Sequence, residues 1–137
     1  MSILNVLYQS NNSYAPITGV SMTSLMENNK DIEVINFYVL DDQISDENVE
    51  KMKSVCAKFG RNIIFVDTEE ILNQLKSLKV APFKNTYTTY FKLFAIHNLD
   101  LPTDRVLQLD GDTVINGSLK ALCEMDLTDC VCAATYD

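Results

Sequence analysis

Residues 32–40 read IEVINFYVL, an apolar run that is interrupted only by Glu33 and Asn36 and that predicts a buried β-strand. Similar runs occur on both sides of it, at residues 3–8, 63–66, 106–109 and 131–134. Strands that are apolar on both faces are typical of parallel sheets covered by helices on both sides. We therefore expect an α/β protein with a mostly parallel, Rossmann-like sheet and helices on both of its faces.

The segments between these runs have the apolar spacing of amphipathic helices. In the first of them, four side chains are expected to face the core: Ile17, Val20, Met22 and Leu25. A second helix should begin after Ser45 and a third after Thr68, because both residues are favoured helix N-caps. A fourth should cover about residues 88–98 and end before Pro102, since the residue that precedes a proline avoids helical angles.

Composition and charge restrict the class of protein. The 137 residues fit a single domain, and 47% hydrophobic and 22% charged residues are ordinary for a globular chain. The net charge of -8 and the scattered basic residues argue against nucleic acid as a partner. No apolar run reaches the ~18 residues of a membrane span, and a secretory signal is not recognisable. We expect a cytoplasmic protein without an integral membrane segment, and leave a peripheral association with the inner membrane face and a homo-oligomer open.

The glycines exclude two common phosphate-binding motifs. Only four occur, and their spacing matches neither a dinucleotide fingerprint nor a P-loop. A phosphorylated ligand would then need another source of positive charge, such as a metal ion. The run at residues 106–109 leads into Asp110-Gly111-Asp112, and in an extended backbone the two carboxylates would point to the same side. Such a pair suits Mg²⁺ or Mn²⁺, which would stabilise the charge on a departing diphosphate.

Two other interpretations of this motif remain. An Asp-Gly pair between apolar runs is equally typical of a two-residue hairpin turn, here with residues 106–109 and 113–115 as its arms. A calcium loop fits less well, because the sixth position counted from Asp110 is Ile115 instead of Gly and the twelfth is Ala121 instead of Glu. The motif alone does not decide between a metal site and a turn.

Several segments together resemble glycosyltransferase family 8, the retaining enzymes that include glycogenin and bacterial lipopolysaccharide galactosyltransferases. They follow one another along nearly the whole chain: NNSYA at residues 11–15, YVLD at 38–41 with IS at 44–45, TYFKL at 89–93 and RVLQLDGD at 105–112. The resemblance implies a GT-A fold of the nucleotide-diphospho-sugar transferase type. It also implies metal-dependent transfer of a sugar from a UDP-sugar donor to a saccharide-type acceptor, which could be a glycan, a lipid-linked saccharide or a protein.

The resemblance assigns roles to residues of the first loop. Base and ribose contacts fall on four of them: Gln9, Ser10, Asn11 and Tyr14. The Tyr14 ring would stack on uracil, a contact for which an aromatic side chain is well suited. Without the resemblance, Tyr14 is better interpreted as a tyrosine at the start of a helix.

Further roles follow for charged residues later in the chain. Asp110 and Asp112 would hold Mn²⁺ or Mg²⁺, and Asp110 and Gly111 would line the donor site. Lys92 corresponds to a basic residue that reaches the donor's phosphate or sugar, where it would offset departing charge. Asp137 resembles an acidic residue near the transferred sugar or the acceptor, and we treat it with Lys92 as a candidate catalytic residue.

Two departures from the family pattern matter. The family's third metal ligand is a histidine far toward the C-terminus, whereas the single histidine here, His97, falls in the fourth helix and is expected at its surface. Family members are also about twice as long. We therefore expect residues 1–137 to be one nucleotide-sugar-binding domain, the N-terminal part of a larger GT-A catalytic domain, which binds nucleotide weakly and does not turn over sugar.

Two alternative functions were considered. Residues 110–114 also fit the nucleophile loop of a haloacid-dehalogenase-type phosphohydrolase, but that loop normally opens the chain, and only 25 residues follow Asp112 here. The other alternative is a non-catalytic nucleotide-sugar-binding module. A zinc site is not expected, because Cys130 and Cys132 alternate like strand residues and, with Cys123, are better interpreted as small buried thiols.

Overall fold

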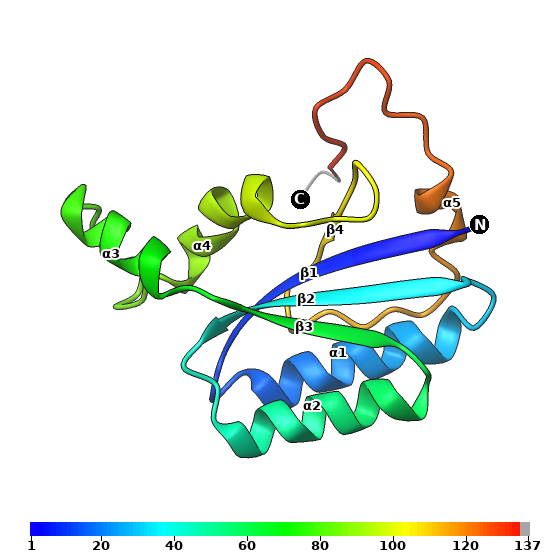
Figure 1. Ribbon diagram of the computed structural model, residues 1–137, viewed down its shortest axis with the longest axis horizontal. Coiled ribbons are helices and arrows are strands. Elements are labelled where there is room, and N and C mark those ends of the chain that lie inside the picture. Colours follow the sequence, from blue (N-terminus) through cyan, green and yellow to red (C-terminus); the bar gives the residue numbers. More distant parts are fainter. Residues whose placement is uncertain (135–137) are drawn as a thin grey trace.

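The computed structural model describes residues 1–134, which contain a parallel four-stranded sheet (Figure 1). The strands are β1 (Ile3–Asn11), β2 (Val34–Asp42), β3 (Asn62–Asp67) and β4 (Leu107–Gln108). Their order across the sheet is β3-β2-β1-β4, and every neighbouring pair is parallel. The expected parallel sheet and four of the five expected strands are therefore confirmed.

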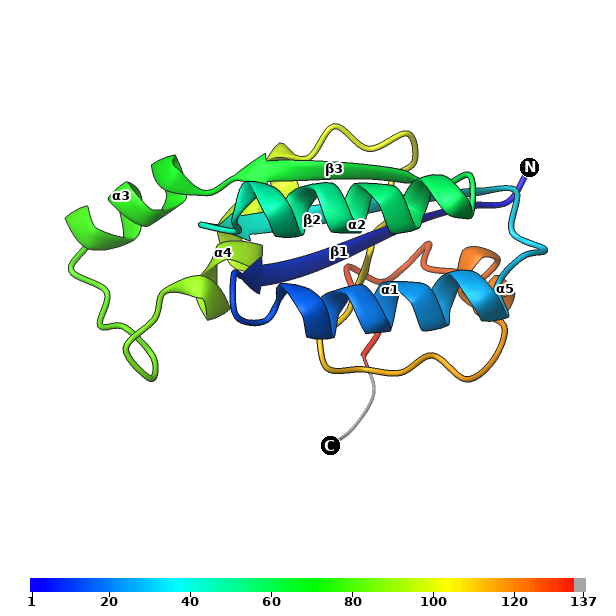
Figure 2. The ribbon, with the colours of Figure 1, turned by 90° about the horizontal axis from the view of Figure 1, so that it is seen from below.

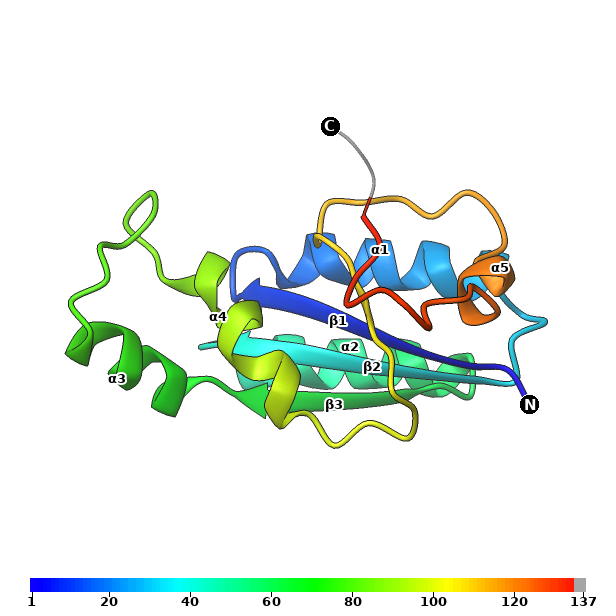
Figure 3. The ribbon, with the colours of Figure 1, turned by 90° about the horizontal axis from the view of Figure 1, so that it is seen from above.

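Helices cover both faces of this sheet. They are α1 (Ala15–Asn28), α2 (Asp46–Lys58), α3 (Glu69–Ser77), α4 (Thr88–Ala95), the 3-10 helix η1 (Ile96–Asn98) and α5 (Lys120–Cys123). Helices α1 and α2 lie side by side on one face (Figure 2), and α4 crosses the other (Figure 3). Helix α3 extends beyond the edge at which the strands end. The helix expected at about residues 88–98 is confirmed as α4 continued by η1.

Alternation along the strands divides the core into two layers. From β1, Leu4, Val6 and Tyr8 enter the layer beneath α1 and α2, while Leu7 enters the layer that contains Phe91 of α4. All five side chains are almost completely buried. Burial of side chains of this size stabilises a fold by about 1.5–3 kcal/mol each, which is why a strand that is apolar on both faces requires helices on both.

The helix N-caps are confirmed in part. The Ser45 hydroxyl accepts a hydrogen bond from the Asn48 N–H (3.4 Å), as expected for the cap of α2. Thr68 stands at the N-cap of α3, but its hydroxyl donates to the Asp41 carbonyl (2.6 Å). Thr68 therefore connects the ends of β2 and β3.

The buried face of α1 differs from the expected one. Ile17 and Val20 are 43% and 62% exposed, whereas Thr18 and Ser21 are buried beside Met22. Leu25 is buried as expected. The difference arises because these polar residues have hydrogen-bond partners inside the fold: Thr18 donates to the Ser10 hydroxyl, and Ser21 contacts the Thr113 hydroxyl.

The C-terminal part of the described chain also corrects the expectations. Residues 131–134 form no strand, because an apolar run of four residues does not by itself supply a pairing partner. Cys130 and Cys132 are exposed and Cys123 is half-buried, so none of them is the small buried thiol expected. Cys56 is the buried one, and burial raises the pKa of its thiol to about 11. Within residues 1–134, no helix combines the length and apolarity needed to cross a bilayer.

Three asparagines form a ladder across the sheet on the α4 side. Asn5, Asn36 and Asn62 are paired in register on β1, β2 and β3. The Asn62 amide donates to Asn36 Oδ1 (2.9 Å), and the Asn36 amide donates to Asn5 Oδ1 (2.9 Å). The Asn5 amide donates in turn to Thr103 Oγ1 (2.8 Å) and the Arg105 carbonyl (3.1 Å). The ladder therefore joins three strands to the segment that leads into β4.

The ladder predicts a measurable contribution to stability. Asn36→Ala removes its central member and leaves the buried Asn5 carboxamide oxygen without a donor. We expect the free energy of unfolding in urea to fall by about 1–3 kcal/mol. Asn98→Ala, at an exposed position of η1, is the control and should change it by less than about 0.5 kcal/mol. Equal effects of the two substitutions would contradict a structural role for the ladder.

Candidate functional site

A tight turn follows β4 at the edge where the strands end. We call residues 110–113 the acidic turn, because they include Asp110 and Asp112. The Thr113 N–H and hydroxyl both donate to the Asp110 carbonyl, at 3.2 and 2.8 Å. The expected extended backbone at the two aspartates is therefore wrong. The expected hairpin is wrong too, because β4 pairs in parallel with β1 and residues 113–115 form no strand among the described residues.

Gly111 brings the acidic turn against the start of α1. A Cβ atom at this position would lie 2.5 Å from Thr18 Oγ1 and 3.6 Å from Cδ1 of the Tyr14 ring. Thr18 is fully buried, so it has little freedom to move away. The absence of a side chain at Gly111 therefore allows the turn to approach Tyr14, which was expected at the nucleotide site. The first loop and the acidic turn are therefore adjacent.

A basic side chain lies beside Asp110. Lys92 Nζ of α4 is 3.9 Å from Asp110 Oδ1, and the Gln108 amide donates to the same oxygen (3.2 Å). The two charged side chains are 27% and 66% exposed. A pair this exposed contributes at most about 1 kcal/mol to stability, so its main consequence is to place a positive charge beside the acidic turn.

Side chains of the first loop differ in their availability to a ligand. Asn11 Oδ1 accepts from the Tyr14 N–H (3.0 Å) and so supports the start of α1. Ser10 is buried, and its hydroxyl accepts from Thr18 (3.2 Å) and donates to the Asn11 carbonyl (3.1 Å). Tyr14 is 43% exposed. Gln9 Oε1 is buried without a hydrogen-bond partner among residues 1–134, and a buried acceptor of this kind has capacity for a donor.

The polar side of α1 holds the chain that follows the acidic turn. Figure 2 shows this segment running alongside α1 toward α5. Ser21 Oγ is 3.1 Å from Thr113 Oγ1, and Ser24 Oγ accepts from the Ile115 N–H (3.0 Å). Further along, the Asn28 amide donates to the Ile115 carbonyl (3.0 Å). The sequence interpretation missed these residues, although small polar residues at i, i+3 spacing in an otherwise apolar helix were a usable signal.

Other titratable side chains near the strand ends have structural contacts or lie elsewhere. Asp41 Oδ1 accepts from the Ile44 N–H (2.7 Å), and Asp42 accepts from the Thr88 hydroxyl, which joins β2 to the start of α4. His97 is exposed on η1, as expected. Asp137 lies outside the described residues. Within residues 1–134, no group of three or more His, Cys, Asp or Glu side chains is arranged to hold a metal ion.

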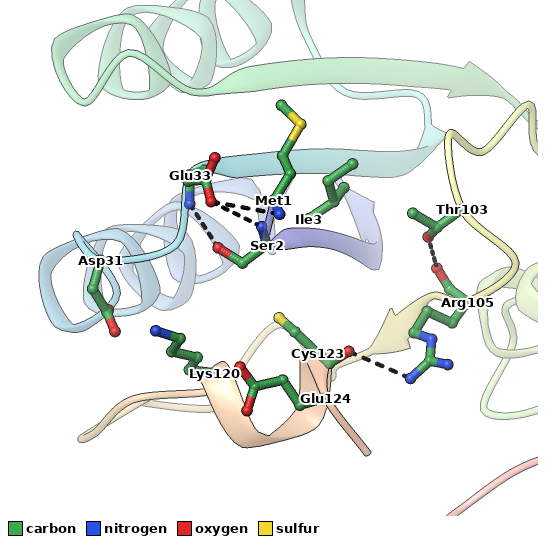
Figure 4. A pocket seen from close by; sticks show the side chains of 10 residues that line it. All are labelled: Met1, Ser2, Ile3, Asp31, Glu33, Thr103, Arg105, Lys120, Cys123 and Glu124. Carbon is green, nitrogen blue, oxygen red and sulfur yellow. Dashed lines mark hydrogen bonds and ion pairs between the residues drawn. The ribbon is translucent and has the colours of Figure 1, made fainter. Parts of the chain in front are cut away.

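A hollow of about 460 Å³ lies at the opposite end of the sheet (Figure 4). Some of its polar groups already have protein partners. Glu33 Oε1 accepts from the Ser2 N–H (3.2 Å), and the Arg105 guanidinium donates to the carbonyls of Cys123 (3.5 Å) and Met125 (2.7 Å). The residues predicted to bind donor and metal gather instead at the ends of the strands, the edge where α/β sheets bind ligands.

Comparison with known proteins gives consistent matches. The family model of glycosyl transferase family 8 matches residues 5–137. The lipopolysaccharide 1,2-glucosyltransferase of Escherichia coli (strain K12) is 30% identical over 138 residues, which cover 98% of this chain and 38% of that protein. The lipopolysaccharide 1,3-galactosyltransferase of Salmonella typhimurium is 29% identical, with coverage of 91% and 36%. The chain therefore spans less than half the length of these relatives.

The fold is also found in solved glycosyltransferases. Galactosyltransferase LgtC, crystallised with donor and acceptor sugar analogs, matches with a TM-score of 0.77 at 28% identity over 92% of this chain and 44% of LgtC. The bifunctional glycosyltransferase WbbM matches with a TM-score of 0.68 at 21% identity over 92% of this chain and 21% of WbbM, which bears on the fold alone. The likeness to LgtC confirms the expected GT-A fold.

The close approach at Gly111 predicts a specific steric effect. Gly111→Ala would bring a methyl group against Thr18 Oγ1. We therefore expect the free energy of unfolding, measured in urea, to fall by about 1–3 kcal/mol. A double-mutant cycle would compare the effect of Gly111→Ala in the wild-type protein and in Thr18→Ala. We expect the substitution at Gly111 to destabilise Thr18→Ala by less than it destabilises the wild-type protein. Gly117→Ala is the control, because a Cβ there meets no described atom within 4 Å. Additive effects at Gly111 and Thr18 would contradict direct contact.

Proposed function

This chain belongs to glycosyltransferase family 8, and on that premise we propose that it is the nucleotide-sugar-binding part of a larger GT-A catalytic domain. The complete domain would transfer a sugar from a UDP-sugar to a glycan, lipid or protein acceptor, with retention of configuration and with Mn²⁺ or Mg²⁺. The observation that carries the proposal is the meeting of the acidic turn with Tyr14 and Lys92 where the strands end.

The acidic turn has a donor set suited to a hard divalent cation. Asp110 and Asp112 are exposed carboxylates separated by one residue on a turn whose backbone is held by Thr113. Mg²⁺ and Mn²⁺ prefer such oxygen ligands and commonly complete their shells with water and phosphate oxygens. Asp110 and Asp112 would hold the ion, which when bound supplies Lewis-acid stabilisation to the diphosphate leaving group.

Lys92 would act on the same leaving group by charge. Its ammonium lies 3.9 Å from Asp110 Oδ1, so it is already at the edge of the turn where a diphosphate would sit. A positive charge fixed there would be worth more as the diphosphate acquires negative charge than in the ground state. Because Lys92 is only 27% exposed, its interaction with a phosphate is less screened than that of a fully exposed lysine.

The first loop would hold the nucleoside. Tyr14 presents a half-exposed ring next to Gly111, in a position to stack on a base whose diphosphate occupies the acidic turn. Gln9 Oε1 has capacity for a donor, such as an N–H or hydroxyl of the nucleoside. Asn11 and Ser10 would shape the loop, since their side chains already bond to the start of α1 and to the loop backbone.

Transfer itself would need more than these residues. The acidic turn provides two carboxylates, so further metal ligands must come from the diphosphate, from water or from other parts of a longer protein. Asp137 remains a candidate near the transferred sugar. We therefore propose that residues 1–137 bind the donor nucleotide without turning over sugar, and that the acceptor is bound elsewhere in the full-length protein.

The proposal predicts stabilisation that requires nucleotide and metal together. UDP with Mn²⁺ should raise the thermal unfolding midpoint of the chain, whereas either alone should have a much smaller effect. At a hundred times Kd the stabilisation amounts to about 2.7 kcal/mol, or several degrees. Asp112→Ala should abolish the joint effect, and Asp129→Ala, at another exposed aspartate, should preserve it.

The other outcomes distinguish the alternatives. Indifference of the wild-type chain to UDP and Mn²⁺ would overturn the donor-site proposal. Release of phosphate from a model ester, lost in Asp110→Asn, would favour the phosphohydrolase. If UDP and Mn²⁺ together raised the unfolding midpoint equally in wild type and Asp112→Ala, the proposal of nucleotide binding would stand, but Asp112 would be rejected as a metal ligand.

A further inference from the structure

We propose that a chain of three hydroxyl groups, which begins at the buried Tyr8 and Ser21 and ends at the half-buried Thr113, holds the acidic turn in the conformation that binds metal and diphosphate. The proposal rests on the proposed function and extends it to residues that do not themselves contact the donor. Tyr8, Ser21 and Thr113 would be positioning residues, which act through the backbone of the turn that carries Asp110 and Asp112.

The distances define a continuous hydrogen-bonded chain. Tyr8 Oη on β1 is 2.8 Å from Ser21 Oγ on α1, and Ser21 Oγ is 3.1 Å from Thr113 Oγ1. Thr113 Oγ1 is 2.8 Å from the Asp110 carbonyl oxygen. Tyr8 and Ser21 are almost completely buried, so water does not compete for these groups. The chain therefore leads from the centre of the sheet to the first residue of the acidic turn.

Hydrogen counting gives this chain a direction. A carbonyl oxygen only accepts, so the Thr113 hydroxyl must donate its single hydrogen to the Asp110 carbonyl. Ser21 must then donate to Thr113, and Tyr8 must donate to Ser21. All three bonds point toward the turn, an arrangement in which each bond strengthens the next by polarisation.

Tyr8 is suited to be the fixed donor at the origin of the chain. Burial raises the pKa of its phenol to about 12. The phenol therefore keeps its proton throughout the physiological pH range. It remains the donor to Ser21, and the direction of the hydrogen bonds is preserved. Tyr8 is also positioned by its ring, which packs against Phe37 with centroids 6.3 Å apart.

The Thr113 hydroxyl restrains the acidic turn and contributes little to the packing of the core. Thr113 closes the turn twice, with its N–H and with its hydroxyl, on the same Asp110 oxygen. Asp112 lies between the two residues so joined. The opposite side of the turn is limited by Thr18, which leaves no room for a side chain at Gly111. Loss of the Thr113 hydroxyl would release one of these restraints while leaving the surrounding apolar core intact.

The test compares a substitution that keeps the shape of Thr113 with one that keeps its hydroxyl group. Thr113→Val removes the hydroxyl, and Thr113→Ser retains it. Calorimetric titration of UDP in the presence of Mn²⁺ should show affinity reduced roughly tenfold or more in Thr113→Val and within about threefold of wild type in Thr113→Ser. Ser24→Ala is the control, because it removes a bond from α1 to Ile115, beyond the acidic turn, and should leave the affinity unchanged.

A second measurement is made without ligand. Amide hydrogen exchange of residue 113, whose N–H donates to the Asp110 carbonyl, should be faster in Thr113→Val than in wild type and unchanged in Thr113→Ser, because the hydroxyl restrains the turn before any ligand arrives. Should Thr113→Val fail to fold, Tyr8→Phe removes the donor at the far end of the chain and is expected to weaken binding and speed exchange in the same direction.

The outcomes separate this inference from the function on which it rests. Absence of Mn²⁺-dependent UDP binding in the wild-type chain would overturn both. Normal wild-type binding that persists in a folded Thr113→Val or Tyr8→Phe variant would overturn the inference alone. Equal loss in Thr113→Val and Thr113→Ser would also overturn it, since the hydroxyl would then not be the responsible group.

Discussion

Hydrogen bonds from the polar side of α1 decide where the chain runs after β4. β4 itself is two residues long, and the hydrogen bonds from α1 add to its short pairing in attaching residues 113–119 to the rest of the fold. Ser21, Ser24 and Asn28 bind this segment at successive points. Although α1 is only weakly amphipathic, its inward polar groups have hydrogen-bond partners in this segment, so the helix binds the segment in one defined position. The Ser21–Thr113 contact attaches the acidic turn itself, whereas the bonds of Ser24 and Asn28 attach the chain that follows it.

The electrostatics of the site follow from the same arrangement. The chain is strongly acidic, with a net charge of -8, and an anionic ligand would be repelled by most of its surface. Lys92 counters this locally, since α4 delivers its ammonium to the side of Asp110. Two carboxylates and one ammonium together can accept a cation and an anion at once. This combination is what a metal–diphosphate complex requires, whereas a free phosphate alone would find less compensation.

The sequence was sufficient for the sheet and insufficient for the contacts of α1. Apolar runs predicted β1, β2, β3 and β4, because a strand that is buried on both faces is apolar along most of its length. The same rule placed Val20 in the core and added a strand at residues 131–134, since hydrophobicity does not reveal whether a partner exists. The resemblance located Lys92 and Asp110 near one another. It could not locate Tyr8 or Thr113, whose hydroxyls matter only through a meeting of residues distant in sequence.

The asparagine ladder also has a consequence for how the strands find their alignment during folding. A shift of β2 by one residue relative to β1 would turn Asn36 toward the apolar layer beneath α1 and α2, where no carboxamide is available to it. Such a misalignment would cost a buried hydrogen bond in addition to mispacked apolar side chains. The ladder thus favours the correct alignment of β1, β2 and β3 over alignments shifted by one residue.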